Sequence, residues 1–417
     1  MRKMVDSGID FIGAIPEHWK ILRIKNLGEF RNGLTYSPQD ICDEDDGILV
    51  LRSSNIKNGK LSLDDNVYVK TSIPNYLMIK EGDILICSRN GSRELIGKNA
   101  VLPQMNATFG AFMMIYRCKN PRYMYYVLNS PVFNYYLASF FTSTINQLTG
   151  SNFGNMKIPY CPDIDEQRAI TSFLDAKCSE IDALIEDIQS EIEVLEAYKR
   201  SVISETVTKG LNKNVEMKDS GTEWLGNIPA HWKITRIGSV YNLRMTKVSD
   251  KDYEPLSVTM KGIVPQLDSA AKTNAHDDRK LVKKGDFVIN SRSDRRGSCG
   301  ISPMDGSVSL INTVLLPLDE MNSEYYDWLF HTLQFADEFY KWGHGIVDDL
   351  WTTGWQDMKR ILIPSPPLSE QAAIANYLNG ICSEIDEILS AKKEQLEVLY
   401  DYKKTIIFEY ITGKKEV

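Results

Sequence analysis

The sequence predicts a mixed α/β protein: two similar globular α+β domains joined by two long antiparallel coiled-coil helices, with an internal pseudo-two-fold repeat. Three observations support this. A helical stretch occurs twice, at 166–200 and 370–404, and a 19-residue leader occurs twice, at 6–24 and 219–237, with twelve identical positions. Both halves keep the same order of leader, globular region and helix, so the chain consists of two tandem repeats.

Each helical stretch carries apolar residues alternately three and four positions apart, which is the spacing of a coiled-coil seam. Lys392 interrupts the second series. A single helix cannot bury such a seam, and the other copy is the nearest partner. The alternative is two ordinary amphipathic helices, each packed on its own domain. The seam residues are Leu174, Cys178, Ile181, Ile185, Ile188, Ile192, Leu195 and Val202 in the first copy, and Leu378, Cys382, Ile385, Leu389, Leu396, Leu399 and Ile406 in the second.

Prolines and glycines set the expected limits of both helices. Asp165 and Ser369 follow prolines as expected N-caps, and no glycine or proline lies between Pro162 and Gly210. The second helix must tolerate Gly380. A helix of about 40 residues is about 60 Å long. A two-fold axis relating the halves would make the helices antiparallel, with the globular regions at opposite ends. The predicted domains are 1–162 (leader and first globular domain), 163–210 (first heptad helix), 211–368 (leader and second globular domain) and 369–417 (second heptad helix).

Composition is that of an ordinary globular protein, with 43% hydrophobic and 25% charged residues. We expect no membrane span and no signal peptide, because no apolar run approaches about 20 residues. The seven cysteines show no Cys-x-x-Cys pair, so we expect reduced thiols and no metal site. The net charge is −8, but the stretches 163–200 and 370–404 carry −7 and −3, which leaves the rest near +2. Basic patches on the globular regions are therefore compatible with the overall charge.

The two globular regions share one local pattern, a Gly-Asp step followed by a short apolar run and a polar loop. The first runs from Gly82 to Arg93 and the second from Gly285 to Gly297. The apolar run predicts a core strand. Arginine and asparagine in the loop can pair with base edges, and serine or lysine suits phosphate. A solvated hairpin end with arginines is the alternative interpretation.

Other segments are interpreted structurally. His18 and His231 each lie in a Pro-x-His-Trp turn without a repeated nucleophile or carboxylate nearby, so we read both as structural. The aromatic runs 123–128 and 325–330 predict core helices. Polar, glycine-bearing loops are expected at 146–157 and 344–359, where they could also reach a partner.

No catalytic constellation is recognisable. A DNA methyltransferase would need a glycine-rich cofactor loop and an Asn/Asp-Pro-Pro-aromatic segment, and Asn120-Pro121-Arg122-Tyr123 lacks the second proline. The run from Gly91 to Asn99 is one residue too long for a phosphate loop and has Asn where Ser or Thr must bind magnesium. The chain is therefore predicted to be non-catalytic, with no catalytic, cofactor or metal residues.

Nearly the whole chain resembles the specificity subunits of type I restriction-modification systems. The resemblance rests on the leader Ser-Gly-x-x-x-x-Gly-x-Ile-Pro-x-His-Trp, the Gly-Asp-strand-Ser-Arg loops and the Pro-x-x-x-Glu-Gln-x-x-Ile helix openings, in the same order in both halves. It implies two target recognition domains, each reading one half of a bipartite site in double-stranded DNA. The helices would space them and dock two modification (methyltransferase) subunits.

The resemblance also implies where the chemistry would lie. S-adenosylmethionine, ATP and Mg²⁺ would bind partner subunits, namely the modification subunits and the ATP-dependent restriction subunits, and none would bind this chain. A prokaryotic, cytoplasmic protein is implied. The residues carried over as DNA-binding are Ser88, Arg89, Asn90, Ser92, Arg93 and Lys98 in the first domain, and Ser291, Arg292, Ser293, Arg295 and Arg296 in the second.

Two other classes stay open at this point. A coiled-coil scaffold without a DNA role predicts no sequence-selective footprint. A methyltransferase with an unrecognised site predicts S-adenosylmethionine binding by the isolated chain. The DNA-reading hypothesis predicts that Arg292→Ala weakens DNA binding without unfolding the protein.

Overall fold

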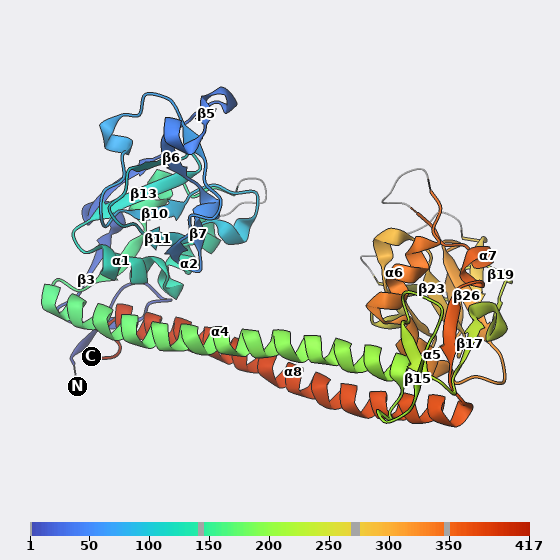
Figure 1. The fold of residues 1–417 in the computed structure, drawn as a ribbon. Coiled ribbons are helices and arrows are strands. Elements are labelled where there is room, and N and C mark those ends of the chain that lie inside the picture. The colour runs from blue at the N-terminus through green and yellow to red at the C-terminus, as the bar shows by residue number, and fades with distance from the viewer. Residues whose placement is uncertain (1, 141–145, 268–275, 346–350) are drawn as a thin grey trace. The chain divides into compact units, whose positions relative to one another are not determined.

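The computed structural model describes residues 2–140, 146–267, 276–345 and 351–417 (Figure 1). Contacts divide the chain into two compact units. Unit 1 comprises Met1–Ile188 with Glu394–Val417, and unit 2 comprises Gln189–Lys393. The long helices α4 (Ile164–Lys209) and α8 (Leu368–Ile411) each contribute one part to each unit. None of the described helices is long and apolar enough to cross a membrane.

Unit 1 is built on two four-stranded sheets, ordered β11-β10-β13-β4 and β12-β6-β9-β5. The first sheet is antiparallel throughout, and β12 runs parallel to β6 in the second. The strands are β1 (Met4–Asp6), β2 (Ala14–Pro16), β3 (Lys20–Arg23), β4 (Gly28–Asn32), β5 (Ile41–Cys42), β6 (Ile48–Leu51), β7 (Ile56–Lys57), β8 (Lys60–Leu61), β9 (Tyr68–Val69), β10 (Ile84–Cys87), β11 (Asn99–Val101), β12 (Ala107–Phe109), β13 (Met113–Cys118) and β14 (Lys157–Tyr160), and the short helices are α1 (Pro121–Leu128), α2 (Pro131–Phe140) and α3 (Gly150–Asn155).

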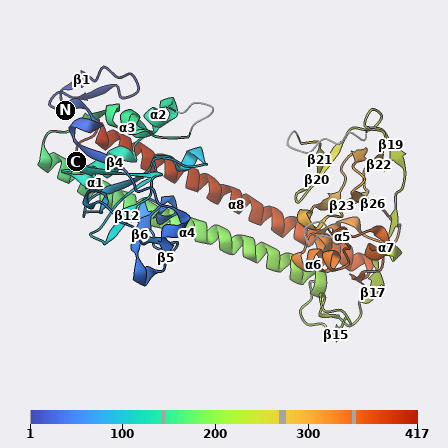
Figure 2. The same cartoon turned by 90° about the horizontal axis from the view of Figure 1, so that it is seen from above.

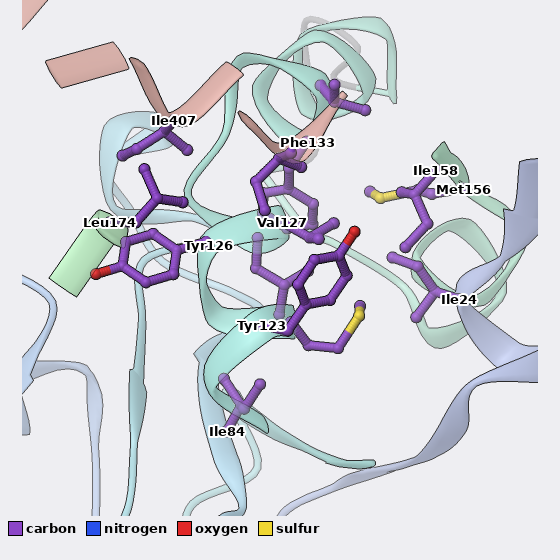
Figure 3. Close-up of a cluster of buried hydrophobic side chains, with 14 of the residues drawn as sticks. Ile24, Ile84, Tyr123, Tyr126, Val127, Phe133, Met156, Ile158, Leu174 and Ile407 are labelled. Carbon is purple, nitrogen blue, oxygen red and sulfur yellow. The ribbon is translucent and has the colours of Figure 1, made fainter. Parts of the chain in front are cut away.

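The strand after the first Gly-Asp step, β10, is buried on both faces, as its apolar run predicts. Ile84 and Ile86 face a core shared with α1, α2 and the long helices, whereas Leu85 and Cys87 face the second sheet. Figure 3 shows the first of these cores, where Tyr123 and other α1 side chains lie between the sheet and the long helices. The aromatic run at 123–128 is therefore a core helix, and the sheet is sandwiched between helices and a second sheet.

Unit 2 repeats this arrangement with the sheets β18-β26-β23-β24 and β19-β22-β25. Phe287 and Ile289 of the strand after the second Gly-Asp step face the helices, and Val288 faces the smaller sheet. Its elements are β15 (Met217–Asp219), β16 (Asn227–Pro229), β17 (Lys233–Arg236), β18 (Tyr241–Leu243), β19 (Lys247–Val248), β20 (Leu256–Thr259), β21 (Gly262–Pro265), β22 (Arg279–Val282), β23 (Phe287–Asn290), β24 (Cys299–Ile301), β25 (Gly306–Val308), β26 (Asn312–Pro317), β27 (Leu362–Ser365), α5 (Ser323–Phe330), α6 (Leu333–Lys341) and α7 (Trp355–Met358).

Within each unit the parts of α4 and α8 run antiparallel, as the expected two-fold relation between the halves predicts. In unit 1, Phe173 packs on Tyr410 with ring centroids 4.4 Å apart, and Asp182 pairs with Lys403. In unit 2, Lys199 pairs with Asp386 at 2.6 Å. These two ion pairs are equivalent under the repeat, because 182 and 199 correspond to 386 and 403.

Lys392, the break in the second heptad series, is paired with Glu191 across the helices of unit 2. The half-buried Lys392 therefore has a carboxylate partner, and its charge is not left unpaired in the seam. The helix α8 continues through this position without interruption. Gly380 also lies inside the continuous helix, as expected.

The predicted N-caps are wrong. The carboxylate of Asp163 accepts hydrogen bonds from the backbone N–H groups of Asp165 and Glu166, so the first helix begins at Ile164. The second begins at Leu368, which places Ser369 inside its first turn. In both copies the helix begins two residues before the predicted start, and in the first copy the cap is the earlier aspartate, Asp163.

Both views of unit 1 show α1 beside the first turns of α4, and the two chain ends close together (Figures 1 and 2). Arg2 and Glu416 form an ion pair there at 2.7 Å. The loops expected at 146–157 and 344–359 are only partly loops, because α3 and α7 form within them. Thr149 caps α3 with its hydroxyl, which accepts from the N–H of Asn152.

Candidate nucleic-acid interface

The Gly-Asp steps are structural anchors for the strand and loop that follow them. Gly82 and Gly285 have φ of 81° and 91°, a region that favours glycine. Asp83 is fully buried and accepts two hydrogen bonds from Arg117, both 2.7 Å long. Asp286 is held in the same way by Arg244, at 2.6 and 2.8 Å. Each of the two strands, β10 and β23, therefore begins at a charge-paired corner, and the polar loop leaves from its other end.

The first polar loop (residues 88–98) divides into residues that face the protein and residues that face a cavity. Ser88 is buried and its hydroxyl donates to the carbonyl of Phe112 at 3.0 Å. The Arg89 guanidinium lies over the Phe112 ring, 5.2 Å from its centroid. Asn90 donates to the hydroxyl of Ser53 and accepts from the N–H of Ser92. Ser88 is thus a structural residue, whereas Arg89 and Asn90 line the cavity with polar groups.

The remaining predicted residues of this loop lie elsewhere. Arg93 donates to the carbonyl of Ala138, and Lys98 donates to the carbonyl of Ile56 at 3.1 Å. Burial lowers the pKa of Lys98. Ser92 is exposed. None of these three lines the cavity that Arg89 and Asn90 share.

That cavity, here called the first cavity, has a volume of about 1090 Å³. Two buried polar atoms on its wall, Arg52 Nε and Ser54 Oγ, have no hydrogen-bond partner among the described residues. Buried polar atoms are normally satisfied by protein groups or ordered water, so these two atoms are available to hydrogen-bond water or a polar ligand in the cavity. Its lining includes Tyr36, Arg52, Ser53, Ser54, Asp65, Arg89, Asn90, Phe112, Asn146 and Gln147.

The second polar loop (residues 291–296) has more of its charge neutralised. Ser291 is buried against the hydroxyl of Thr313. Arg292 donates to both carboxylate oxygens of Asp294, at 2.8 and 2.9 Å. Arg296 pairs with Asp337 at 2.6 Å and lies over the Tyr340 ring.

Arg295 and Ser293 interact more weakly with other side chains than the other predicted residues of the second loop do. Arg295 approaches Asp294 only at 3.8 Å, and its side chain is 66% exposed. The Ser293 hydroxyl is buried without a partner among the described residues. Of the five predicted residues, the second cavity is lined by Ser293, Arg295 and Arg296 and not by Ser291 or Arg292.

The second cavity has a volume of about 720 Å³. Asn312 lines it, is 6% exposed and has an unsatisfied Oδ1 among the described residues. Arg279 also lines it, buried and bonded only to Ser307, and burial lowers its pKa. Lys280, next in the strand, donates to the Asn312 carbonyl and also has its pKa lowered by burial. Arg279 is therefore a cation on the cavity wall that forms no ion pair with a carboxylate among the described residues.

Sequence reasoning missed the cavity residues that come from other strands and loops, namely Arg52, Ser54, Phe112, Arg279 and Asn312. No local pattern marks them, because they reach the site through tertiary packing. Asn146 and Gln147 belong to a loop that the sequence did single out. In the loop at 344–359, Thr352 bridges to Arg292 in the way that Gln147 bridges to Arg89, but it does not line the second cavity.

The leader histidines hold the openings of the long helices. His18 and Trp19 bind the carboxylate of Glu166 at 2.9 and 3.3 Å, and His231 and Trp232 bind Glu370 at 2.7 and 2.9 Å. The sequence argument that no repeated carboxylate faces these histidines is therefore wrong, because Glu166 and Glu370 are distant in sequence but adjacent in space. Each glutamate also accepts from the neighbouring tryptophan at a helix opening, which is compatible with a structural role. The following glutamines, Gln167 and Gln371, accept hydrogen bonds from the N-cap residues of α1 and α5, Asn120 and Asn322. They also donate to the carbonyl of the residue that follows the preceding strand.

His18, Glu166 and Cys161 place three possible metal ligands within 4.8 Å. They fit a metal poorly. Burial and Glu166 raise the pKa of Cys161 to about 12, and metal binding needs the thiolate. The Arg2 guanidinium already forms an ion pair with the carboxylate of Glu166, at 2.6 Å. The equivalent of Cys161 in the second half is Ser365, so the group does not repeat.

Each unit therefore repeats a sheet with a polar loop and a neighbouring cavity. Residues 16–194 match the type I restriction modification DNA specificity domain. The chain is similar to specificity subunits of type I restriction-modification systems.

Relatives match over nearly the full length. A protein of Methanocaldococcus jannaschii assigned as the MjaX type I restriction enzyme specificity subunit is 28% identical, covering 97% of this chain and 96% of its own. The EcoKI specificity subunit of Escherichia coli K12 is 22% identical over 96% and 90%.

Solved structures share the fold. A chain from a study of assembly and conformational transition of the type I R-M system superposes with a TM-score of 0.69 at 16% identity, covering 96% of this chain and 99% of that one. The HsdS subunit of Thermoanaerobacter tengcongensis superposes with a TM-score of 0.50 at 17% identity, over 96% and 98%.

Proposed function

We propose that this chain is the non-catalytic, DNA-reading subunit of a type I restriction-modification complex, and that each globular head reads one half of a bipartite site. The first head is residues 25–162 and the second is residues 238–366. The observation that carries the proposal is the repeated cavity: each head places arginines and buried, unsatisfied polar atoms beside the loop that follows its Gly-Asp strand. Base edges supply the donors and acceptors that such atoms lack.

The different lining of the two cavities supports two different half-sites. The first is lined by the exposed aromatic ring of Phe112 and by Arg89, whereas the second is lined by the buried Arg279 and Asn312. Leaders and helix openings, by contrast, use the same residues in both halves. That division is expected if the heads bind different sequences while the rest serves the same purpose twice.

We propose that the paired helices space the heads along DNA. A helix of 46 residues is about 69 Å long, close to two turns of duplex at about 34 Å per turn. The antiparallel contacts within each unit support a spacer of this kind. The acidic helix faces are poor DNA surfaces, which leaves base reading to the heads.

The same helices carry a repeated, exposed apolar surface that supports docking of two identical partners. Leu184 and Ile388 are both 46% exposed, Val194 and Val398 are 65% and 63% exposed, and Tyr198 and Tyr402 are 51% and 52% exposed. Each pair is related by the same 204-residue shift. Modification subunits are the proposed occupants. They would carry S-adenosylmethionine, and the restriction subunits would carry ATP and Mg²⁺.

The test is selection from a DNA library by the full chain purified with its modification subunits. The expected product is a bipartite consensus with a fixed gap and adenine methylation that depends on both halves. Recovery of random DNA would contradict the proposal and favour a scaffold without a DNA role. Binding of S-adenosylmethionine by the isolated chain would favour a methyltransferase instead.

A further inference from the structure

The first cavity contains a guanidinium without a carboxylate partner. Among the described residues no Asp or Glu pairs with Arg89, whose guanidinium instead stacks on Phe112. The equivalent arginine of the second head, Arg292, is bound by both oxygens of Asp294. The position of Asp294 is occupied by Gly91 in the first head. One residue therefore decides whether the loop arginine is free or neutralised.

A second group lies beside Arg89. Gln147 forms an antiparallel bridge with Arg89, and the N–H of Leu148 donates to the carbonyl of Ser88 at 2.7 Å. Residues directly opposite in an antiparallel pair project to the same face with Cβ atoms about 5 Å apart. No described residue hydrogen-bonds the Gln147 amide, and both side chains line the first cavity.

The two groups have complementary preferences. An arginine fork pairs with the O6 and N7 atoms of guanine, and a glutamine amide pairs with the N6 and N7 atoms of adenine. Phe112 is 57% exposed and supports the guanidinium plane, which reduces the freedom that Arg89 must lose on binding. Phe112 acts here as a positioning residue.

Resting on the proposed function, we infer that Arg89 and Gln147 form one reading element, in which Arg89 contacts a guanine and Gln147 an adjoining adenine of the first half-site. The second head lacks this element, because Thr352 occupies the position of Gln147 and Arg292 is bound to Asp294. The half-site read by the first head therefore contains a guanine next to an adenine, and the other half-site has no counterpart read in this way.

The experiment is library selection with the full chain and its modification subunits, comparing wild type with Gln147→Ala, Arg89→Ala and Gly91→Asp. Gln147→Ala should lower the preference for one adenine by about 5- to 150-fold, and Arg89→Ala should do the same for the adjoining guanine. Gly91→Asp should reproduce the Arg89→Ala result by supplying the carboxylate, since a Cβ at Gly91 meets no atom within 4 Å. Phe112→Ala should weaken the guanine preference and Phe112→Tyr should restore it.

Gln104→Ala is the matched control, because Gln104 is an exposed glutamine of the same head outside the cavity. It should leave every base preference unchanged. Unchanged preferences in Gln147→Ala and Gly91→Asp, with a normal bipartite consensus from wild type, would overturn the reading element and leave the proposed function standing. A wild type that selects no consensus would overturn the proposed function itself.

Discussion

The Asp286–Arg244 pair should be among the strongest single contributions to the stability of the second head. The Asp286 side chain is 2% exposed and makes two hydrogen bonds to Arg244, and it also accepts from the N–H of Lys283 at 2.8 Å. Removing one partner of a buried ion pair costs about 3–5 kcal/mol, because the other charge is left uncompensated.

The exposure of Arg244 reduces that figure for Asp286→Ala. The guanidinium is 20% exposed and can recover some hydration, so we expect a loss of about 2–4 kcal/mol in the free energy of unfolding. For a unit of this size that corresponds to a fall of roughly 4–16 °C in melting temperature. Urea unfolding measures the energy, and hydrogen exchange in β23 and β26 assigns the loss to the second head.

Two controls sharpen this experiment. Asp305→Ala removes an exposed carboxylate that pairs with Lys283 at 2.7 Å, and it should change stability little because exposed ion pairs contribute little. In the double variant with Arg244→Leu, the loss should be smaller than the sum of the single losses. A loss below about 1 kcal/mol in Asp286→Ala would refute the view that this pair anchors the strand.

Three further predictions concern other ion pairs of the protein. Lys392→Leu should complete the heptad seam and stabilise the protein by about 1 kcal/mol in urea unfolding, whereas loss of stability would show that the pairing with Glu191 is needed. Burial alone would raise the pKa of Glu166, but hydrogen bonds from His18 and Cys161 and the charge of Arg2 lower this pKa below 4.5. The ionised carboxylate therefore stabilises the fold above pH 4.5. This contribution is lost as the pH falls through the lower pKa of the folded state. The free energy of unfolding of Glu166→Gln should therefore fall less than that of wild type between about pH 6 and pH 3, and the difference should correspond to the pKa shift of Glu166. Arg292→Ala should weaken DNA binding less than Arg89→Ala while leaving the melting temperature unchanged, because Asp294 already neutralises Arg292; equal losses in a gel shift at physiological salt would contradict this.

Sequence periodicity was sufficient to predict the elements whose buried residues follow a regular spacing within one segment of the chain. Nine of the fifteen predicted heptad residues are buried and six are half-buried. The buried ones are Leu174, Cys178, Ile181, Ile185, Leu378, Cys382, Ile385, Leu389 and Ile406, and the half-buried ones are Ile188, Ile192, Leu195, Val202, Leu396 and Leu399. The strands after the Gly-Asp steps and the aromatic helices were predictable for the same reason: their apolar residues are contiguous in sequence.

The candidate sites were predictable only in part, because a cavity wall is assembled from distant segments. Arg52 and Arg89 are 37 residues apart in the chain yet line the same cavity. Sequence alone also treated all loop arginines alike. Whether an arginine can bind a ligand depends on its partners, and only the structure shows that Arg292 and Arg296 are each held by an aspartate.

The repeated Glu-Gln step explains why leader and helix opening are the parts of the chain that stay alike. Glu166 and Glu370 bind the leader through His and Trp, while Gln167 and Gln371 bind the start of α1 and α5. Three segments must therefore match at one point, so a change in any of them breaks contacts in the other two. The cavity residues make no such three-way contact. A head can consequently exchange Gly91 for Asp, or Gln147 for Thr, and change what it reads without disturbing how it is mounted on its helix.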